Sequence, residues 1–340
     1  MRDAMCLVPR APDPAISALA RRTLGFAPTV LDYLGPCPWL AHGEIAFHAA
    51  RPIHLSSRLC ELVPYAVAVD RRASHLVGSL AAFLRLAGYA REELAAIEAG
   101  PPLRGFATAE VAALEHAIEI AQGHGSDSLG VLAGAGYSAA ARTELTALAA
   151  LVVFGASVAD SLAVPADRIE AFERSLLAKL LRPLIRRRIQ ALRGKHARPD
   201  PIGTAGTLFP RIINALAGTP LQKLARDVLE AAWQSPILPA HEKALAIATV
   251  FDTLGTTTMA DEVRMLHAHE ARSDRERALR DYARVAALQR CDASHVAARL
   301  LVRSLRTDEL IEAVGIVALA AAMGRIAIVL DVPQAMSAHG

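Results

Sequence analysis

The sequence predicts an all-α protein in which one helical module occurs twice in tandem. Apolar residues make up 53% of the 340 residues, and aromatic residues only 4%. Alanine and leucine dominate, while glycine and proline gather between stretches of helical period, and this composition favours helices packed on helices. Residues 28–34 (PTVLDYL) also align with residues 210–216 (PRIINAL), an offset of 210 − 28 = 182 that brings Pro38 onto Pro220.

A chain of this length can bury two ordinary cores, because domains usually hold about 100 to 200 residues each. We expect a first helical domain at residues 1–172, a basic linker helix and linker at 173–203, and a second, shortened helical domain at 204–340. The 37 basic and 34 acidic residues give a net charge of only +3. Such a balance offers no large positive field, so we expect no nucleic-acid partner.

The cysteines and the apolar runs indicate a cytoplasmic protein without a membrane span. The cysteines, at positions 6, 37, 60 and 291, lie far apart and lack metal-type spacing, and a chain with so large a core does not need disulfides. Residues 1–14 lack the continuous apolar region of a signal peptide. The most apolar runs, at 145–159 and 313–324, are shorter than the roughly 18 residues that argue for a membrane span. We therefore expect both runs to be buried core helices.

The first copy of the module begins with a helical hairpin. Ser56 and Ser57 can cap a helix whose apolar residues recur with helical period up to Val67, and Pro64 is expected to kink it. After the polar residues 70–72, a second helix starts at Ser74 and stops at Gly88.

The second copy repeats this hairpin. Its first helix starts at residues 238–241, its elbow spans 252–258 and its second helix covers 259–266, at an offset of 238 − 55 = 183. The closing segments, 144–165 and 312–333, align at a smaller offset of 312 − 144 = 168. The second copy has therefore lost about fifteen residues, opposite the glycine-proline loop at 100–105. We interpret that loop as an insertion, either a lid or a plain connector.

Between the two copies, residues 174–198 form a strongly basic segment with interleaved leucines. An amphipathic basic helix can lie on an anionic membrane or pack against a neighbouring subunit. The simpler interpretation is an interdomain helix with one buried face and one solvated basic face. Residues 197–203 (ARPDPIG) then serve as linker.

The first hairpin resembles the carboxymuconolactone decarboxylase and alkylhydroperoxidase D superfamily. The residues that carry the resemblance are 55–63 (LSSRLCELV), 73–76 (ASHL) and 84–89 (LRLAGY), and the closing helix at 312–333 is similar as well. The resemblance covers nearly the whole chain as two tandem copies. It implies an all-α fold of two alkylhydroperoxidase D-like helical repeats packed as a pseudo-dimer, and further assembly into a homo-oligomer.

In the peroxidase branch of that family a glutamate precedes a C-x-x-C dithiol, and a histidine follows it. A dithiol at a helix N-terminus has a lowered thiolate pKa, and the carboxylate and imidazole relay protons. The corresponding positions here are Ala73 and Leu76 for the cysteines and Leu80 for the histidine, and only Glu61 remains. The second copy has lost every element, since it carries Thr256, Met259, Val263 and Ala244.

Three residues of the first copy are candidates for catalysis. Glu61 lies in an otherwise apolar helix, where a carboxyl group facing a pocket would have a raised pKa and act as a general acid or base. The alternative is a carboxylate paired with Arg58 or Arg71. His75 can supply a second proton-transfer group near Glu61, or it is a solvent-facing residue at the helix start. Cys60 can act as a lone peroxidatic thiol, although adjacent helical residues point about a hundred degrees apart, or it is a small buried hydrophobe.

Other polar constellations are weaker. Glu44 and His48 have the i, i+4 spacing of a metal site, with His54 nearby, but no fourth ligand is indicated. Residues 262–270 hold two glutamates and two histidines, Cys291 and His295 are four residues apart, and residues 256–258 are three threonines that suit a helix cap. No glycine-rich phosphate loop follows a strand. We expect neither a metal nor a cofactor.

Three functions are compatible with these residues. The first is non-thiol acid/base chemistry on a small, mostly apolar organic acid or lactone, as the decarboxylase branch implies, with Glu61 as proton shuttle in the first repeat. The second is a catalytically silent binding or assembly protein. The third is an alkylhydroperoxide-type peroxidase that uses Cys60 or Cys291 alone. If the protein is an enzyme, the first interpretation makes it a decarboxylase- or isomerase-like lyase.

Overall fold

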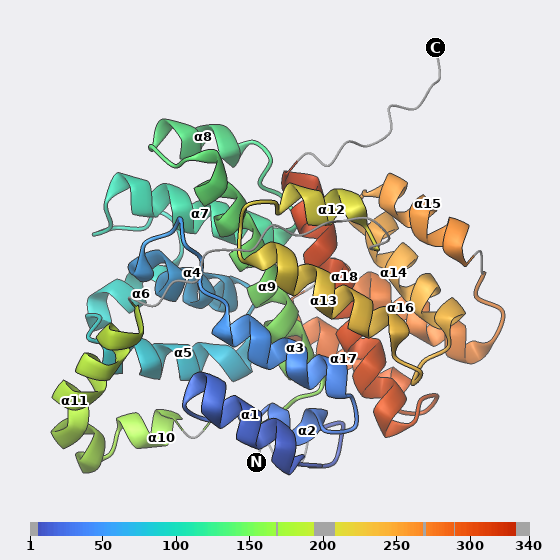
Figure 1. Ribbon diagram of the computed structural model, residues 1–340, viewed down its shortest axis with the longest axis horizontal. Coiled ribbons are helices and arrows are strands. Elements are labelled where there is room, and N and C mark those ends of the chain that lie inside the picture. The colour runs from blue at the N-terminus through green and yellow to red at the C-terminus, as the bar shows by residue number, and fades with distance from the viewer. Residues whose placement is uncertain (1–5, 168, 194–207, 268–269, 289, 331–340) are drawn as a thin grey trace.

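The computed structural model describes residues 6–167, 169–193, 208–267, 270–288 and 290–330. The described residues form eighteen helices and no strand (Figure 1). The all-α prediction is therefore confirmed. We refer to residues 6–167 as the first half and to residues 208–330 as the second half.

The first half contains nine helices. They are α1 (Pro14–Leu24), α2 (Leu31–Leu34), α3 (Pro38–Ala49), α4 (Ser57–Asp70), α5 (Ser74–Ala87), α6 (Arg91–Ala99), α7 (Thr108–Gln122), α8 (Ser128–Gly134) and α9 (Ala139–Ser161). The predicted hairpin is α4 and α5. The Ser56 hydroxyl accepts a hydrogen bond from the Leu59 amide at 3.2 Å, and Gly88 ends α5 in the left-handed conformation, with φ of 108°.

Two helices follow on the outer side of α5, and seven more form the second half. The first two are α10 (Ile169–Glu173) and α11 (Leu176–Arg193). The second half contains α12 (Pro210–Ala215), α13 (Leu221–Gln234), α14 (Ala240–Thr253), α15 (Thr257–Leu266), α16 (Asp274–Leu288), α17 (Cys291–Leu301) and α18 (Thr307–Val329). The expected linker at 197–203 lies outside the described residues.

Helix boundaries recur along the chain with the offsets of the sequence alignment. Helices α4 and α14 have 14 residues each and start 240 − 57 = 183 residues apart, and α5 and α15 start 257 − 74 = 183 apart. Helices α9 and α18 have 23 residues each and start 307 − 139 = 168 apart. The extra residues of the first half are α6 and the loop after it, because the described residues between α15 and α16 form no helix.

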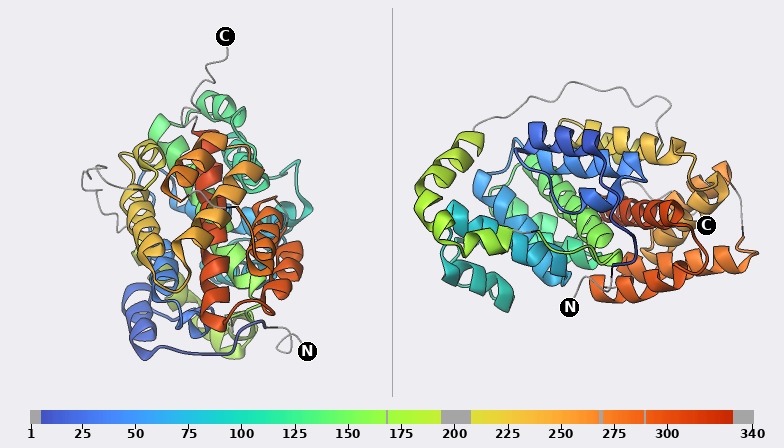
Figure 2. Two further views of the ribbon diagram at one scale, coloured as in Figure 1. Left: turned by 90° about the vertical axis from the view of Figure 1, so that its right-hand side faces the viewer. Right: turned by 90° about the horizontal axis from the view of Figure 1, so that it is seen from below.

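The long helices α9 and α18 pack against each other at the centre of the molecule (Figures 1 and 2). The expectation that both apolar runs are too short for a membrane span was wrong as to length, because each helix extends to 23 residues and is apolar enough to cross a membrane. The most apolar stretch of 18 residues is 78% buried inside the protein in α9 and 94% buried in α18. Both are therefore core helices, as predicted.

Buried apolar residues of both halves form one continuous core. The cluster runs from Val8 and Ile16 in the first half to Ile326 and Val329 at the end of α18. The two cores that the chain length suggests are thus merged along α9 and α18. A hydrogen bond also joins the two halves, because the Trp39 indole Nε1 of α3 donates to Glu312 Oε1 of α18 at 3.0 Å.

Two buried arginines occupy the junction where α7 and α16 end. Arg71 Nη1 donates to the carbonyl oxygen of Ala121 at 3.3 Å, and Arg325 Nη2 donates to the carbonyls of Ala121 at 3.2 Å and Ala287 at 2.8 Å. The C-terminal carbonyl groups of a helix carry partial negative charge, so they suit a guanidinium. Burial, and then the neighbouring Arg71, lower the pKa of Arg325 to about 9.

Helix α11 differs from the simple interdomain helix expected from its sequence. Ala178 is buried, and Leu181 and Ile185 are partly buried. Leu176, Leu180 and Leu184 are instead 77%, 79% and 64% exposed. Periodicity predicted an apolar side but could not tell which leucines a neighbouring helix would cover.

Candidate functional site

Glu61 is half-buried on α4 and accepts a hydrogen bond from the Tyr89 hydroxyl at 2.8 Å. The two arginines considered as its ion-pair partners make other contacts. Arg58 donates to Glu93 Oε1 at 2.7 Å and to Glu110 Oε1 at 2.6 Å, whereas Arg71 reaches the helix-end carbonyls. Glu61 is therefore a half-buried carboxylate of α4 that is hydrogen-bonded to the Tyr89 phenol.

His75 is buried, so the interpretation as a solvent-facing residue was wrong. Only 3% of it is exposed, because α9 and the segment after it cover the start of α5. Its backbone amide donates to Asp160 Oδ1 at 3.3 Å, and its Nδ1 lies 3.3 Å from the Val164 carbonyl oxygen. A carbonyl oxygen only accepts, so Nδ1 carries the hydrogen in this contact and Nε2 is left with a basic lone pair.

Glu61 and His75 have hydrogen-bond partners at opposite ends of α5. His75 is the second residue of this helix, whereas Tyr89, the partner of Glu61, follows its last residue. A helix of 14 residues is about 20 Å long. The hydrogen bonds of these two side chains therefore lie far apart along α5, which does not favour the predicted cooperation between them.

The cysteine thiols lie in surroundings that oppose thiolate formation. Burial, and then the nearby carboxylates of Glu144 and Glu61, raise the pKa of Cys60 to about 12, although Arg51 acts in the opposite direction. Burial also raises the pKa of Cys291 to about 12, together with Asp160, although Arg71 acts in the opposite direction. His295, the predicted partner of Cys291, places its Nδ1 3.2 Å from the Ser161 carbonyl. Since the thiolate is the nucleophile, these positions do not favour peroxide chemistry.

The place where the resemblance would put the dithiol is filled. Ala73 is fully buried and packs in a small apolar cluster with Ala68, Ala156 and Cys291. Cys291 comes from the second half and is held there, since its amide donates to the Arg71 carbonyl at 3.1 Å. A residue of the other half thus packs beside the position where the resemblance would put the first cysteine.

The most unusual carboxyl group of the first half is Glu44 on α3. It is 4% exposed and lies against Gly155 of α9, where a Cβ would be 3.4 Å from Glu44 Oε2. Among the described residues, nothing forms a hydrogen bond with its Oε1. Burial raises the pKa of Glu44 to about 8. A carboxyl group that gains and loses its proton near neutral pH is suited to general acid/base work.

His48 lies one helical turn after Glu44 and connects it to solvent. Its Nε2 is 3.8 Å from Glu44 Oε2, and 42% of the imidazole is exposed. Surrounding protein atoms, and then His75 and Arg51, lower the pKa of His48, while Asp167 acts in the opposite direction. Because so much of the ring is exposed, we expect this lowering to be small.

Asp160, at the end of α9, adds a second buried carboxyl group. Its Oδ1 accepts from the Ser74 hydroxyl at 2.7 Å and from the His75 amide. Its Oδ2 is buried and has no hydrogen-bond partner in the part of the chain that the structure describes. Burial raises the pKa of Asp160, although Ser74 and His75 oppose the change. We call Glu44, His48, His75 and Asp160 the first-half polar cluster.

Sequence reasoning found only part of this cluster. The i, i+4 spacing of Glu44 and His48 indicates a weak metal site, and Asp160 is not among the residues predicted from the sequence. The burial of Glu44 depends on Gly155, which is 111 residues away in the sequence (155 − 44). One usable signal was present, since Asp160 is the only charged residue between Glu144 and Asp167.

The other predicted constellations have ordinary roles. No group of three histidine, cysteine, aspartate or glutamate side chains in the described part of the chain could hold a metal ion. Glu262 pairs with Arg211 at 3.3 Å, and the ring of His267 lies 5.8 Å from that of Trp233. His269 lies outside the described residues. The Thr256 hydroxyl donates to the Phe251 carbonyl at 3.0 Å, so it closes α14 and does not cap α15.

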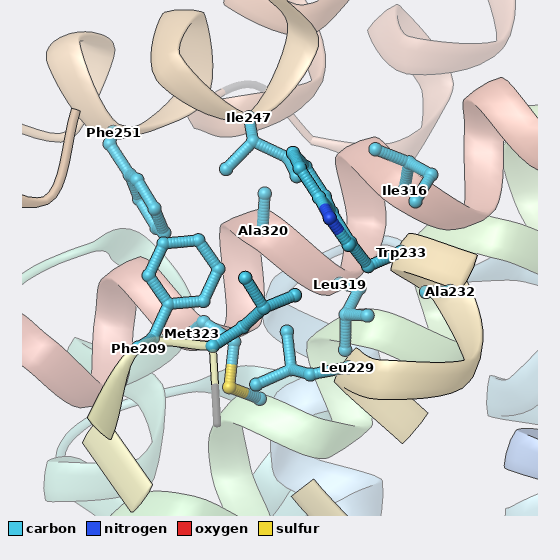
Figure 3. Close-up of a pocket in the computed structure, with 11 residues that line it drawn as sticks. Phe209, Leu229, Ala232, Trp233, Ile247, Phe251, Ile316, Leu319, Ala320 and Met323 are labelled. Atoms are coloured by element: carbon cyan, nitrogen blue, oxygen red, sulfur yellow. The ribbon is translucent and has the colours of Figure 1, made fainter. Parts of the chain in front are cut away.

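An apolar pocket lies in the second half, between α13, α14 and α18 (Figure 3). Its cavity volume is only about 10 Å³, so the lining side chains nearly fill it. Phe209 and Phe251 meet edge to face at one end, with ring centroids 5.4 Å apart, and Trp233 stands at the other end. The remaining lining is aliphatic or Met323, and it includes no ionisable side chain. The pocket is therefore a small apolar gap whose lining offers no acid or base.

A scan against protein-family models, a search of curated proteins and a search of solved structures each gave no match. The family resemblance therefore rests on the residues of the sequence alone.

Proposed function

We propose that the protein is a non-thiol acid/base catalyst for a small organic acid or lactone, with its proton-transfer groups in the first half. The observation that carries the proposal is the Glu44 carboxyl group, which is buried, has an unpartnered oxygen and lies 3.8 Å from a histidine that reaches solvent. In this proposal Glu44 transfers the proton at the substrate carbon. His48 returns that proton to solvent, and His75 and Asp160 provide a second acid/base pair.

The proposal shifts the reactive group from Glu61, which the sequence resemblance indicates, to Glu44. Glu61 is half-buried and bonded to Tyr89, whereas Glu44 lacks a full set of partners and has a pKa of about 8. A pKa close to the working pH gives the best compromise between holding and releasing a proton. Glu61 is kept as the rival assignment.

The resemblance extends to the architecture, so we also propose that the two halves are repeats of one alkylhydroperoxidase D-like module packed as a pseudo-dimer. Equivalent side chains at the sequence offsets do equivalent work. Glu144 accepts from the Ile53 and His54 amides at 3.0 and 2.7 Å, and Glu312 accepts from the Leu238 amide. The chain has four free cysteines, which fits the cytoplasmic location expected from the sequence.

The test is solvent deuterium exchange. The full-length protein is incubated in D₂O with a panel of small unsaturated lactones and the corresponding carboxylic acids, and proton NMR follows loss of signal at carbons next to the carbonyl group. We expect exchange of at least one compound, with Glu44→Gln slowing it about a hundredfold or more. The matched control is Asp227→Asn on α13, because that carboxylate is partly exposed and pairs with Lys223 and Arg226.

The Glu44→Gln and Glu61→Gln variants show which of the two carboxyl groups is reactive. If Glu61→Gln abolishes exchange and Glu44→Gln does not, the reactive carboxyl group is Glu61 and our assignment is wrong. If no lactone or acid in the panel exchanges with the wild-type protein, the acid/base proposal fails.

The apolar lining of the pocket supports a second candidate function, the binding of a small apolar ligand without chemistry. Because the cavity volume is only about 10 Å³, the lining side chains must move apart to admit the ligand. Trp233 lines the pocket and reports its occupancy through fluorescence. A titration with 1-anilinonaphthalene-8-sulfonate should quench Trp233, and Met323→Trp should block binding by filling the space. Unchanged binding in the Met323→Trp protein would mean that the dye sits elsewhere.

A further inference from the structure

Helix α11 presents a continuous leucine stripe to solvent. Leu176, Leu180 and Leu184 follow each other at four-residue intervals, so they lie on one face, and each is more than 60% exposed. Arg187 follows Leu184 by three residues, is exposed, and extends the same face. The helix lies at the edge of the molecule, away from the central α9 and α18 (Figures 1 and 2).

The opposite face of α11 is fixed to the body of the protein. Ala178 is 1% exposed, and α11 packs against α5. The Arg186 guanidinium lies on Gly88, where an added Cβ would be 2.6 Å from its Nη2. Gly88 is the left-handed residue that ends α5, so the cation meets the negative end of a helix dipole. Arg182 lies 3.9 Å from Glu173 of α10. These contacts hold the leucine stripe outward.

The charge of this helix is concentrated and of one sign. Residues 176–193 include six lysines and arginines and no acidic residue, whereas the whole chain has a net charge of only +3. A partner that covers the stripe must therefore offer an apolar layer next to negative charge.

We propose that α11 binds the surface of an anionic lipid bilayer. The leucines enter the layer below the headgroups while Arg187, which extends the same face, stays at the level of the phosphates. A second copy of this chain fits poorly, because a two-fold contact would bring two sets of six positive charges together. A protein groove that encloses a basic helix is also disfavoured, since α5 already covers one side. The flat surface of a bilayer would contact only the exposed face of α11.

The test is sedimentation of the full-length protein with phosphatidylcholine vesicles that contain or lack phosphatidylglycerol. We expect binding only to the anionic vesicles, and weaker binding as salt is raised. Leu180→Glu combined with Leu184→Glu should reduce the binding constant at least about tenfold, because two anchors become charged. The matched control is Val296→Glu with Leu300→Glu on α17, which are 63% and 62% exposed and also four residues apart.

Two results would overturn the proposal. One is equal binding of the wild-type protein and the α11 double variant to anionic vesicles, with circular dichroism showing both folded. The other is a wild-type dimer in light scattering that the α11 double variant abolishes, without any vesicle binding, which would make a second copy the occupant. Since the deuterium-exchange assay contains no lipid, failure of one proposal leaves the other standing.

Discussion

At the scale of single residues, Glu44 links burial to a measurable pH response. Its pKa is raised from 4.5 to about 8 because α9 excludes water from the carboxyl group. The folded protein therefore keeps this proton in a pH range where the unfolded chain has lost it. The stabilising effect is fully present below pH 4.5 and is lost as the pH rises through about 8.

We predict that Glu44→Gln removes this dependence. Glutamine is a neutral isostere of the protonated acid, so the variant should gain stability relative to the wild type as the pH rises from 5 to 8, on the order of a few kcal/mol. Urea unfolding followed by circular dichroism across this range measures the difference. Parallel stability curves for the two proteins would show that the carboxyl group is already ionised at pH 5.

A second residue-scale prediction concerns the buried pair Lys243 and Glu312. Both are fully buried, with 3.6 Å between Lys243 Nζ and Glu312 Oε1, and the ammonium also donates to the carbonyls of Ala232 and Trp233. Glu312→Ala leaves the ammonium buried without its counter-charge, so we expect a loss of about 3 to 5 kcal/mol in the free energy of unfolding.

Glu144→Ala is the matched control for this prediction. Glu144 is equally buried and accepts two backbone hydrogen bonds, but no ion pair with a lysine is present around it among the described residues. We expect the control to lose less stability. Equal losses in urea unfolding would mean that the ion pair with Lys243 adds nothing to the hydrogen bonds that Glu312 accepts.

At the scale of helices, the central helix α18 depends on a glycine at a close contact. A Cβ at Gly315 would lie 2.8 Å from Leu40 Cδ2 and 3.1 Å from Trp39 Cη2, and Leu40 is fully buried. Gly315→Ala gains helix propensity but overpacks the interface with α3. We expect overpacking to win and to destabilise the protein by about 1 to 3 kcal/mol.

The control is Gly130→Ala on α8, where nothing lies within 4 Å of the added Cβ. At this position only the helix propensity of the residue changes, so Gly130→Ala should be more stable than the wild type by up to about 1 kcal/mol. Thermal unfolding of both variants gives the two signs. Stabilisation by Gly315→Ala would show that Leu40 moves aside at little cost.

Local sequence signals were sufficient for most helices but not for their exposed faces. The serine before α4 and the glycine after α5 predicted these helix ends, because capping is decided by neighbouring residues. The burial of His75 and Glu44 arises from α9, which is distant in sequence. The exposed leucines of α11 could not be distinguished from the covered ones for the same reason.

At the scale of the whole molecule, the continuous core predicts cooperative unfolding. The chain has two tryptophans, and each reports on one half, Trp39 on α3 and Trp233 on α13. Because α9 and α18 share one core and Trp39 bonds to Glu312, we expect both halves to unfold together.

Trp39→Phe and Trp233→Phe leave one reporter each. In urea titrations we expect the fluorescence transition of each variant to coincide with its own circular dichroism transition. A variant in which the remaining tryptophan changes before or after the helical signal would show that the halves unfold separately.

At the centre of the molecule, Arg71 and Arg325 donate hydrogen bonds to backbone carbonyl groups, which do not titrate. Carboxylates of surface ion pairs take up protons in acid, whereas the carbonyls of Ala121 and Ala287 do not. As the pH falls, the surface ion pairs should therefore break first. The hydrogen bonds from the two arginines to the ends of α7 and α16 should persist longest. Amide hydrogens around this junction are the ones we expect to remain protected in an acid-expanded state.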